Sequence, residues 1–229
     1  MKKSLLSLSF FLITLFASTS TEAQNLQVHY DFERECVTST LEMFKPDKYG
    51  NTYFFVDMDH GSNGVEGTSL AYMEISRVFK TDKMPIGIHA EYDGGLLRSG
   101  TNGFEINNAW LAGIDYSINA EDFSKGITFK ALYKYIQGKH DASYQFTTVW
   151  YWNFLDNKIT FSGFADFWRE DNIYFDGSDD TKFVFLSEPQ LWYNINSNIS
   201  VGGEVEFSSN FGGTHGFKTR PTLAAKWIF

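Results

Sequence analysis

Residues 217–229 read FKTRPTLAAKWIF, and this segment decides the fold class of the chain. Its side chains alternate between two faces, as side chains do in a β-strand. One face is apolar and aromatic and comprises Leu223, Ala225, Trp227 and Phe229. The opposite face is more polar and comprises Thr222, Ala224 and Lys226. This pattern is typical of a strand with lipid on one side and a polar interior on the other, as in a transmembrane β-barrel.

The composition of the whole chain agrees with a barrel. Phe, Tyr and Trp make up 18% of the 229 residues, yet the mean hydropathy is slightly negative, because aromatic residues alternate with polar ones. After residue 23 no apolar run approaches the ~20 residues of a transmembrane helix. A chain without such helices satisfies its backbone hydrogen bonds in lipid only as a closed barrel. A soluble β-sandwich or lipocalin-like barrel is the alternative, but it would expose runs such as Tyr144, Phe146, Trp150 and Trp152 to water.

Alternation interrupted by turn sequences predicts an all-β fold, an antiparallel up-and-down transmembrane barrel of about twelve strands. The predicted strands cover residues 26–33, 37–45, 52–59, 69–80, 86–93, 104–118, 126–137, 143–154, 159–170, 182–194, 199–208 and 217–229. Pro189 and Pro221 fall within strands, where each requires a bulge or a lost ladder bond.

The predicted connections alternate in length. Those after the second, fourth, eighth and tenth strands are tight, whereas those after the third, fifth, ninth and eleventh are longer and polar or Gly-rich. Residues 94–103 form one of the longer loops, and residues 171–180 form the longest, which is acidic. Bacterial barrels have short periplasmic turns and long external loops, so we expect both termini in the periplasm.

The first 23 residues are expected to be a cleaved signal peptide, followed by the barrel domain at residues 24–229. Lys2 and Lys3 form a cationic start, residues 5–17 are apolar, and residues 21–23 offer a small-x-small cleavage site. The apolar stretch is too short to cross a membrane as a helix. Export and a barrel fold together predict the outer membrane of a Gram-negative-type envelope.

The last strand, ending in Phe229, resembles the C-terminal recognition signal of outer-membrane barrels. This resemblance implies that the barrel-assembly machinery is a partner, and that outer-membrane lipid surrounds the folded barrel.

The same alternation assigns a set of polar and aromatic side chains to the barrel interior. The predicted lumen and substrate-binding set comprises His29, Asp31, Glu33, Glu42, Asp57, Tyr72, Glu74, His89, Glu91, Asp166, Trp168, Glu188, Trp192, Glu204 and Arg220. Further inward-facing residues are Gln27, Asp59, Asp93, Lys130, Lys134, Gln190, Glu206, Lys218 and Lys226. A Lys or Arg on the lipid face near the membrane midplane would cost roughly 2–4 kcal/mol, which enforces the pattern.

Two functions fit this interior. Side chains can fill the interior of an eight-stranded barrel, but twelve strands enclose more space. The first function is therefore a narrow, acidic, aromatic-lined channel for small neutral or cationic polar solutes. In the second, carboxylates and cations pair across the lumen and close a purely structural barrel. The chain has a net charge of −9. Nucleic-acid binding needs a basic face, which this charge balance does not supply. No metal constellation or cofactor motif is recognised.

Three segments resemble the Tsx-type nucleoside-specific channels of the outer membrane. They are residues 40–44 (TLEMF), residues 54–59 (FFVDMD) after the turn at 47–50, and residues 72–79 (YMEISRVF). The resemblance implies a twelve-stranded barrel that passes nucleosides and deoxynucleosides, with Glu42, Asp57 and Glu74 lining the lumen. The chain is shorter than typical members and has shorter external loops, so a different solute stays open.

A second resemblance favours an enzyme. Residues 60–63 (HGSN), with Glu74 further along, resemble the His-x-Ser-Asn motif of outer-membrane phospholipase A and lipid A deacylase. The resemblance implies an acyl hydrolase in which Ser62 is the nucleophile, His60 the general base and Glu74 the group that orients His60. Alternation places His60 and Ser62 on the lipid side but Glu74 on the interior side, which disfavours this reading.

Overall fold

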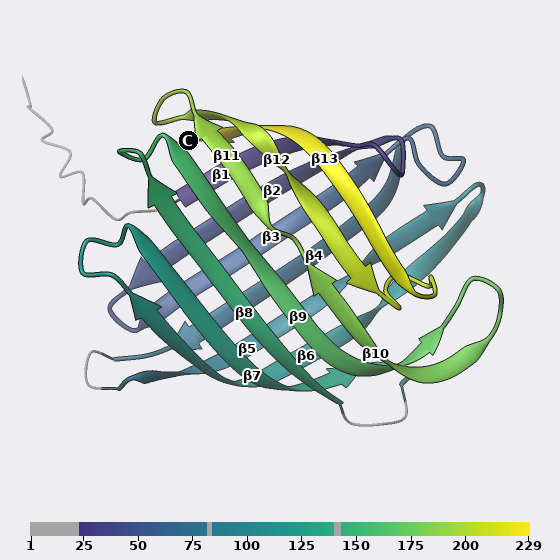
Figure 1. Ribbon diagram of the computed structural model, residues 1–229. Helices are drawn as coiled ribbons and strands as arrows, with labels where there is room; N and C mark the ends of the chain where they lie inside the picture. The colour runs from purple at the N-terminus through teal and green to yellow at the C-terminus, as the bar shows by residue number, and fades with distance from the viewer. Residues whose placement is uncertain (1–22, 82–83, 140–142) are drawn as a thin grey trace, which may run out of the picture.

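The computed structural model describes residues 23–81, 84–139 and 143–229, which form one β-barrel and its connections (Figure 1). The predicted signal peptide lies outside the described residues except for Ala23, the first residue of the first strand. No helix in the described part of the chain is long and apolar enough to cross a membrane.

The wall of the barrel is built from thirteen strand segments. They are β1 (Ala23–Asp31), β2 (Cys36–Asp47), β3 (Gly50–His60), β4 (Thr68–Phe79), β5 (Ile86–Ser99), β6 (Asn102–Asn119), β7 (Lys125–Ile136), β8 (Ser143–Phe154), β9 (Ile159–Ile173), β10 (Asp179–Ser187), β11 (Gln190–Asn194), β12 (Ile199–Ser209) and β13 (Phe217–Ile228). All pairings are antiparallel, and β1 pairs with both β2 and β13, which closes the sheet. Because β10 and β11 lie end to end between β9 and β12, the wall has twelve strands. The predicted fold is confirmed.

The interruption between β10 and β11 falls at Glu188 and Pro189. Pro189 has no N–H to donate to the sheet. The chain stays attached to both neighbours, because the Glu188 N–H donates to the Phe164 carbonyl (3.1 Å) and the Pro189 carbonyl accepts from the Val205 N–H (3.1 Å). The register with β9 and β12 is the same before and after the break. Of the two outcomes predicted for Pro189, the structure shows a lost ladder bond.

Two predicted loops are largely strand in the structure. Residues 94–103 are not a long loop, since β5 continues to Ser99, β6 begins at Asn102, and only residues 100–101 connect them. Likewise the predicted loop 171–180 shrinks to residues 174–178, between the end of β9 and the start of β10. Gly and Asp have a low intrinsic preference for β-strands. In this barrel the neighbouring strand supplies hydrogen-bond partners for their backbone groups, and the strands continue through them.

The two ends of the barrel differ. Residues 48–49, 120–124, 155–158 and 195–198 form short connections at the end where β1 begins and β13 finishes, which lies at the left of Figure 1. The opposite end carries the longer connections 61–67 and 210–216 and the projecting β9–β10 hairpin. The sequence also predicted a long connection after β5, but residues 100–101 form a tight turn there.

The outer face of the wall is apolar. On β1 the exposed fractions are 36% for Leu26, 45% for Val28 and 44% for Tyr30, whereas the residues between them are buried. Aromatic pairs lie near both ends of the wall: Trp227 and Phe229 at the short-turn end, with ring centroids 5.0 Å apart, and Tyr30 and Phe32 at the other end, 5.3 Å apart. Aromatic girdles of this kind mark the two membrane interfaces of outer-membrane barrels.

Candidate functional site: the barrel lumen

Of the fifteen residues in the predicted lumen and substrate-binding set, fourteen are buried or half-buried in the structure. The almost fully enclosed members of that set are His29, Asp31, His89, Glu91, Trp168 and Trp192. The half-buried members are Glu42, Asp57, Tyr72, Glu74, Asp166, Glu188, Glu204 and Arg220. The half-buried members keep part of their surface in contact with solvent inside the barrel.

Glu33 is the exception, and its assignment to the lumen was wrong. Strand β1 ends at Asp31, and Glu33 is exposed in the turn at residues 32–35. The Asp31 carboxylate causes the turn, because it accepts hydrogen bonds from the backbone N–H groups of Glu33 (2.8 Å) and Arg34 (2.7 Å). A side chain that bonds to the backbone two and three residues later competes with the continuing strand.

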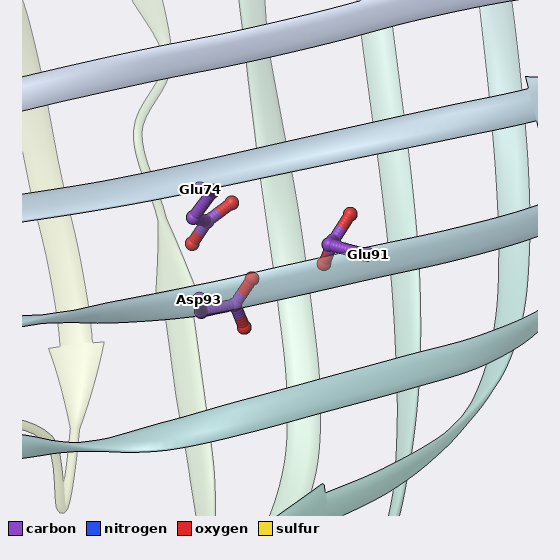
Figure 2. Close-up of side chains that lie close together, drawn as sticks. All are labelled: Glu74, Glu91 and Asp93. Atoms are coloured by element: carbon purple, nitrogen blue, oxygen red, sulfur yellow. The ribbon is translucent and has the colours of Figure 1, made fainter.

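Three carboxylates meet on the lumen side of β4 and β5 (Figure 2). Glu74 and Asp93 are direct cross-strand partners, and Glu91 lies two residues from Asp93 on the same face. One carboxylate oxygen from each lies within 4.8 Å of the other two. We name Glu74, Glu91 and Asp93 the lumen carboxylate cluster. The alternation in the sequence predicts each of these residues inside the barrel, but their spacing forms no recognised metal motif.

The surroundings of the cluster neutralise only part of its charge. His89 Nε2 lies 2.8 Å from Glu91 Oε2, and Lys130 Nζ lies 3.8 Å from the same oxygen. The Tyr72 hydroxyl donates a hydrogen bond to Glu74 (2.8 Å). Within the part of the chain that the structure describes, Glu74 and Asp93 form no ion pair.

A second charged group lies toward the long-connection end and contains two arginines. Arg34 Nε donates to Asp31 Oδ2 at 2.6 Å, and Arg34 Nη2 lies 3.4 Å from Glu206 Oε2. Glu206 also pairs with Arg220. These four residues bridge the β1–β2 turn to β12 and β13, so this group is locally balanced in charge.

A third group surrounds the buried Trp192 ring on β11. Lys226 Nζ lies 3.9 Å from the centroid of this ring, and the His29 ring contacts it edge-on with centroids 5.9 Å apart. Trp192 Nε1 donates to Gln190 (2.9 Å), which in turn donates to Glu204 (2.9 Å). The Lys226 cation is therefore stabilised by an aromatic face.

Three aromatic rings follow one another along the lumen face of β3 and β4. Tyr53 and Phe55 have ring centroids 6.2 Å apart, and Phe55 and Tyr72 have centroids 6.0 Å apart. The outer two rings donate hydrogen bonds to carboxylates, Tyr53 to Glu42 (3.4 Å) and Tyr72 to Glu74 (2.8 Å). We name Tyr53, Phe55 and Tyr72 the aromatic ladder. Of these three rings, only Tyr72 belongs to the set predicted from the sequence to line the lumen.

The residues of the hydrolase-like motif do not assemble into a triad. His60 Nε2 is hydrogen-bonded to the Ser39 hydroxyl (2.9 Å), and the Ser62 hydroxyl is bonded to that of Ser69 (2.5 Å). Glu74 faces the lumen, as the alternation predicted, and bonds to Tyr72. The described geometry therefore gives His60 neither a serine nucleophile from the motif nor a carboxylate that orients it.

Sequence reasoning missed the part played by Arg34. It sits in the first turn, outside any predicted strand, yet it reaches Glu206 on β12. That contact exists only because barrel closure pairs β1 with β13, whose other neighbour is β12. No pattern in the sequence around residue 34 indicates it.

The chain is a closed twelve-stranded antiparallel β-barrel with a polar interior, and this fold is shared with small outer-membrane porins. The NanC porin structure has a TM-score of 0.61 at 11% identity and covers 90% of this chain and 100% of that chain. The KdgM porin has a TM-score of 0.52 at 12% identity and covers 90% and 99%. A second KdgM porin structure, in complex with disordered oligogalacturonate, has a TM-score of 0.51 at 12% identity with the same coverage. At these identities the comparison shows a shared fold.

Residues 23–229 match the family described as Domain of unknown function (DUF5020), and the chain belongs to that family. Among curated proteins, no sequence matches this chain. The fold of this chain thus resembles small outer-membrane porins, and the comparison does not point to the Tsx-type channels in particular.

Proposed function

We propose that this barrel is an outer-membrane channel for the diffusion of small polar solutes that are neutral or cationic. The observation that carries the proposal is the excess of carboxylates inside the barrel. Asp57, Glu74 and Glu188 are half-buried and form no ion pair with any described residue. A narrow passage lined by carboxylates attracts cations and repels anions, because the low-dielectric wall focuses the field.

The aromatic ladder supports a solute with a planar ring. Aromatic faces stack on such rings, and the neighbouring Glu42 and Glu74 can accept hydrogen bonds from hydroxyl or exocyclic amino groups. Nucleosides combine these groups, and the resemblance of three segments to Tsx-type channels makes them the first candidates. Oligogalacturonate, present in the KdgM porin complex, is a polyanion that the uncompensated carboxylates of this lumen would repel.

The test is single-channel recording from the refolded protein in a planar bilayer with a KCl gradient. We expect a reversal potential that shows cation selectivity, and a conductance that adenosine or thymidine reduces while glucose at the same concentration does not. Asp57→Asn and Glu188→Gln should each weaken cation selectivity. Asp122→Asn removes the same charge from an exposed turn outside the barrel wall and should leave selectivity unchanged.

Two outcomes would count against the channel. An anion-selective current would refute the assignment of solute charge. A barrel that inserts but carries no current would favour the closed structural barrel, in which the lumen side chains fill the interior.

We also propose that the short-turn end faces the periplasm, with both termini there and with the strand ending at Phe229 available to the barrel-assembly machinery. An epitope tag inserted between Gly212 and Gly213 should then bind antibody on intact cells. The same tag inserted after Ser197, in a short turn, should bind antibody only after permeabilisation. The reverse result would invert the proposed orientation.

A further inference from the structure

We propose that the lumen carboxylate cluster is a binding site for a hard divalent cation, with Ca²⁺ bound in preference to Mg²⁺. This proposal goes beyond the channel, because a cation site can exist in an open or in a closed barrel.

The spacing of the three carboxylates fits one ion. Ca²⁺ binds oxygen ligands at 2.3–2.6 Å, so two oxygens on opposite sides of the ion are about 4.6–5.2 Å apart. The three oxygens of the cluster lie within 4.8 Å of one another. Figure 2 shows that Glu74 from β4 and Glu91 and Asp93 from β5 turn their carboxylates toward a common space. A single Ca²⁺ in this space can therefore contact all three.

A second observation points to a ligand. Asp93 is 5% exposed, and its Oδ1 atom is buried without any hydrogen-bond partner. An unpaired carboxylate oxygen removed from water is costly, and buried polar atoms of this kind are rare in folded proteins. A bound cation would supply the missing partner. The register irregularity between Asp93 and Gly95, in the pairing of β5 with β6, lies directly beside this residue, and such irregularities often aim side chains at functional sites.

The charge balance fits a divalent ion. Glu91 is the member with basic partners, since its Oε2 atom lies 2.8 Å from His89 Nε2 and 3.8 Å from Lys130 Nζ. Glu74 and Asp93 have no cationic partner among the described residues. Asp166 of β9 adds a further carboxylate, and its Oδ1 atom is also buried and unpartnered. Within the cluster itself, Glu74 and Asp93 are the two carboxylates without an ion pair to any described residue, and two negative charges match one divalent cation.

The neighbouring Lys134 on β7 acts electrostatically on Glu91 and Asp93 but forms no ion pair with any member of the cluster in the described part of the chain. Lys134 Nζ donates to Gln145 (2.7 Å) and lies 4.4 Å from the centroid of the Trp168 ring. It is thus held by β8 and β9 rather than by the cluster. The preference for Ca²⁺ follows from the side chains available, since flexible carboxylates suit its variable coordination, whereas Mg²⁺ demands near-octahedral geometry and gives up its waters reluctantly.

The experiment is isothermal titration calorimetry of CaCl₂, and separately of MgCl₂, into the refolded full-length barrel in detergent. We expect one Ca²⁺ site per chain and weaker Mg²⁺ binding. Asp93→Asn and Glu74→Gln should each lower the Ca²⁺ affinity at least about tenfold, since each removes a charged ligand. Asp122→Asn and Glu66→Gln, at exposed positions, should bind Ca²⁺ like the original chain. Heat-modifiable migration on gels would establish that each variant is folded.

Terbium luminescence is a second measurement of ion binding, and it can be made on the barrel with all three carboxylates intact. Tyr72 bonds to Glu74, so Tb³⁺ in the cluster should be sensitised through Tyr72, and Ca²⁺ should displace it. Tyr72→Phe should lower this emission. Absence of calorimetric Ca²⁺ binding and of displaceable Tb³⁺ emission in the folded barrel would overturn the proposal. Equal Ca²⁺ affinity in the folded Glu74→Gln/Asp93→Asn variant would also overturn it.

These results are separable from the test of the channel. A barrel that binds Ca²⁺ but carries no current keeps the cation site and refutes the channel. A barrel that conducts but does not bind Ca²⁺ keeps the channel and refutes the site.

Discussion

At the residue scale, Asp31 joins the end of a strand to a charged group inside the barrel. Its carboxylate is fully buried, closes the β1–β2 turn through two backbone N–H groups and pairs with Arg34. Arg34 is 39% exposed in its side chain, so solvent screens the ion pair and it contributes less than a fully buried pair would. The hydrogen bonds to the turn and the bond from Arg34 Nε both stabilise this conformation.

We predict that Asp31→Asn destabilises the barrel by about 1–3 kcal/mol, because a buried charged acceptor is replaced by a weaker one. Urea unfolding from lipid vesicles, followed by tryptophan fluorescence, would measure the change. Asp122→Asn is the matched control, since Asp122 accepts a similar bond from the Ser124 N–H (3.0 Å) but is exposed. Equal small losses in the two variants would show that burial of Asp31 is unimportant.

A second residue-scale prediction concerns the pKa of Asp176, in the β9–β10 hairpin at the long-connection end of the barrel. Hydrogen bonds from the Ser178 hydroxyl and from its backbone N–H lower the pKa of Asp176 below its usual 3.8. Since the folded-state pKa is lowered, the stabilisation of this loop by the carboxylate is complete above about pH 3.8 and is lost as pH falls through the folded-state value. An NMR titration of the Asp176 carboxyl carbon should show a midpoint below 3.8 that rises in Ser178→Ala. An unchanged midpoint would remove the hydroxyl as a cause.

At the element scale, the break between β10 and β11 depends on the residue opposite it. Gly163 of β9 has a φ of +151°, and a Cβ placed there would collide with the Glu188 carbonyl and lie 2.9 Å from the Pro189 Cα. The interrupted strand can thus approach β9 closely only because residue 163 has no side chain.

We predict that Gly163→Ala destabilises the barrel by about 1–3 kcal/mol through this overpacking. The temperature at which the folded, fast-migrating band is lost on gels should fall accordingly. Gly103→Ala, on β6, meets no atom within 4 Å and should change that temperature little. A loss as large in Gly103→Ala would point to a general effect of alanine on the strands.

At the scale of the whole molecule, the outer surface implies where lipid begins and ends. Ile114 is exposed on the outer face and pairs with Ala131 near the middle of β7. Ile118 is similarly exposed on the same face but lies one residue from the end of β6, at the short-turn end of the barrel. The same apolar exposure therefore occurs at two different depths.

We predict that Ile114→Arg destabilises the barrel by roughly 2–4 kcal/mol, and that Ile118→Arg costs roughly 0–1 kcal/mol, because the penalty for a cation on the lipid face depends on depth. Equilibrium unfolding in lipid bilayers would measure both. Similar costs at the two positions would contradict the proposed position of the membrane along the barrel.

The sequence by itself determined the barrel and the two faces of its wall. The alternation in residues 217–229 and along β1 predicted which side chains face inward, because the side-chain period of a strand is two and lipid penalises charge on the outer face. It also located Pro189 as an interruption. It misjudged residues 94–103 and Glu33, where pairing with a neighbouring strand and a side-chain bond to the backbone overrode the local pattern.

Only the tertiary structure decided which inward-facing residues meet. Glu74 lies opposite Asp93 because β4 and β5 pair in one particular register, and Arg34 reaches Glu206 because the sheet closes. Register and closure arise from the hydrogen bonds and packing of all strands together, so no segment read alone contains them. The sequence fixes the inventory of the lumen, whereas the folded barrel creates the carboxylate cluster from it.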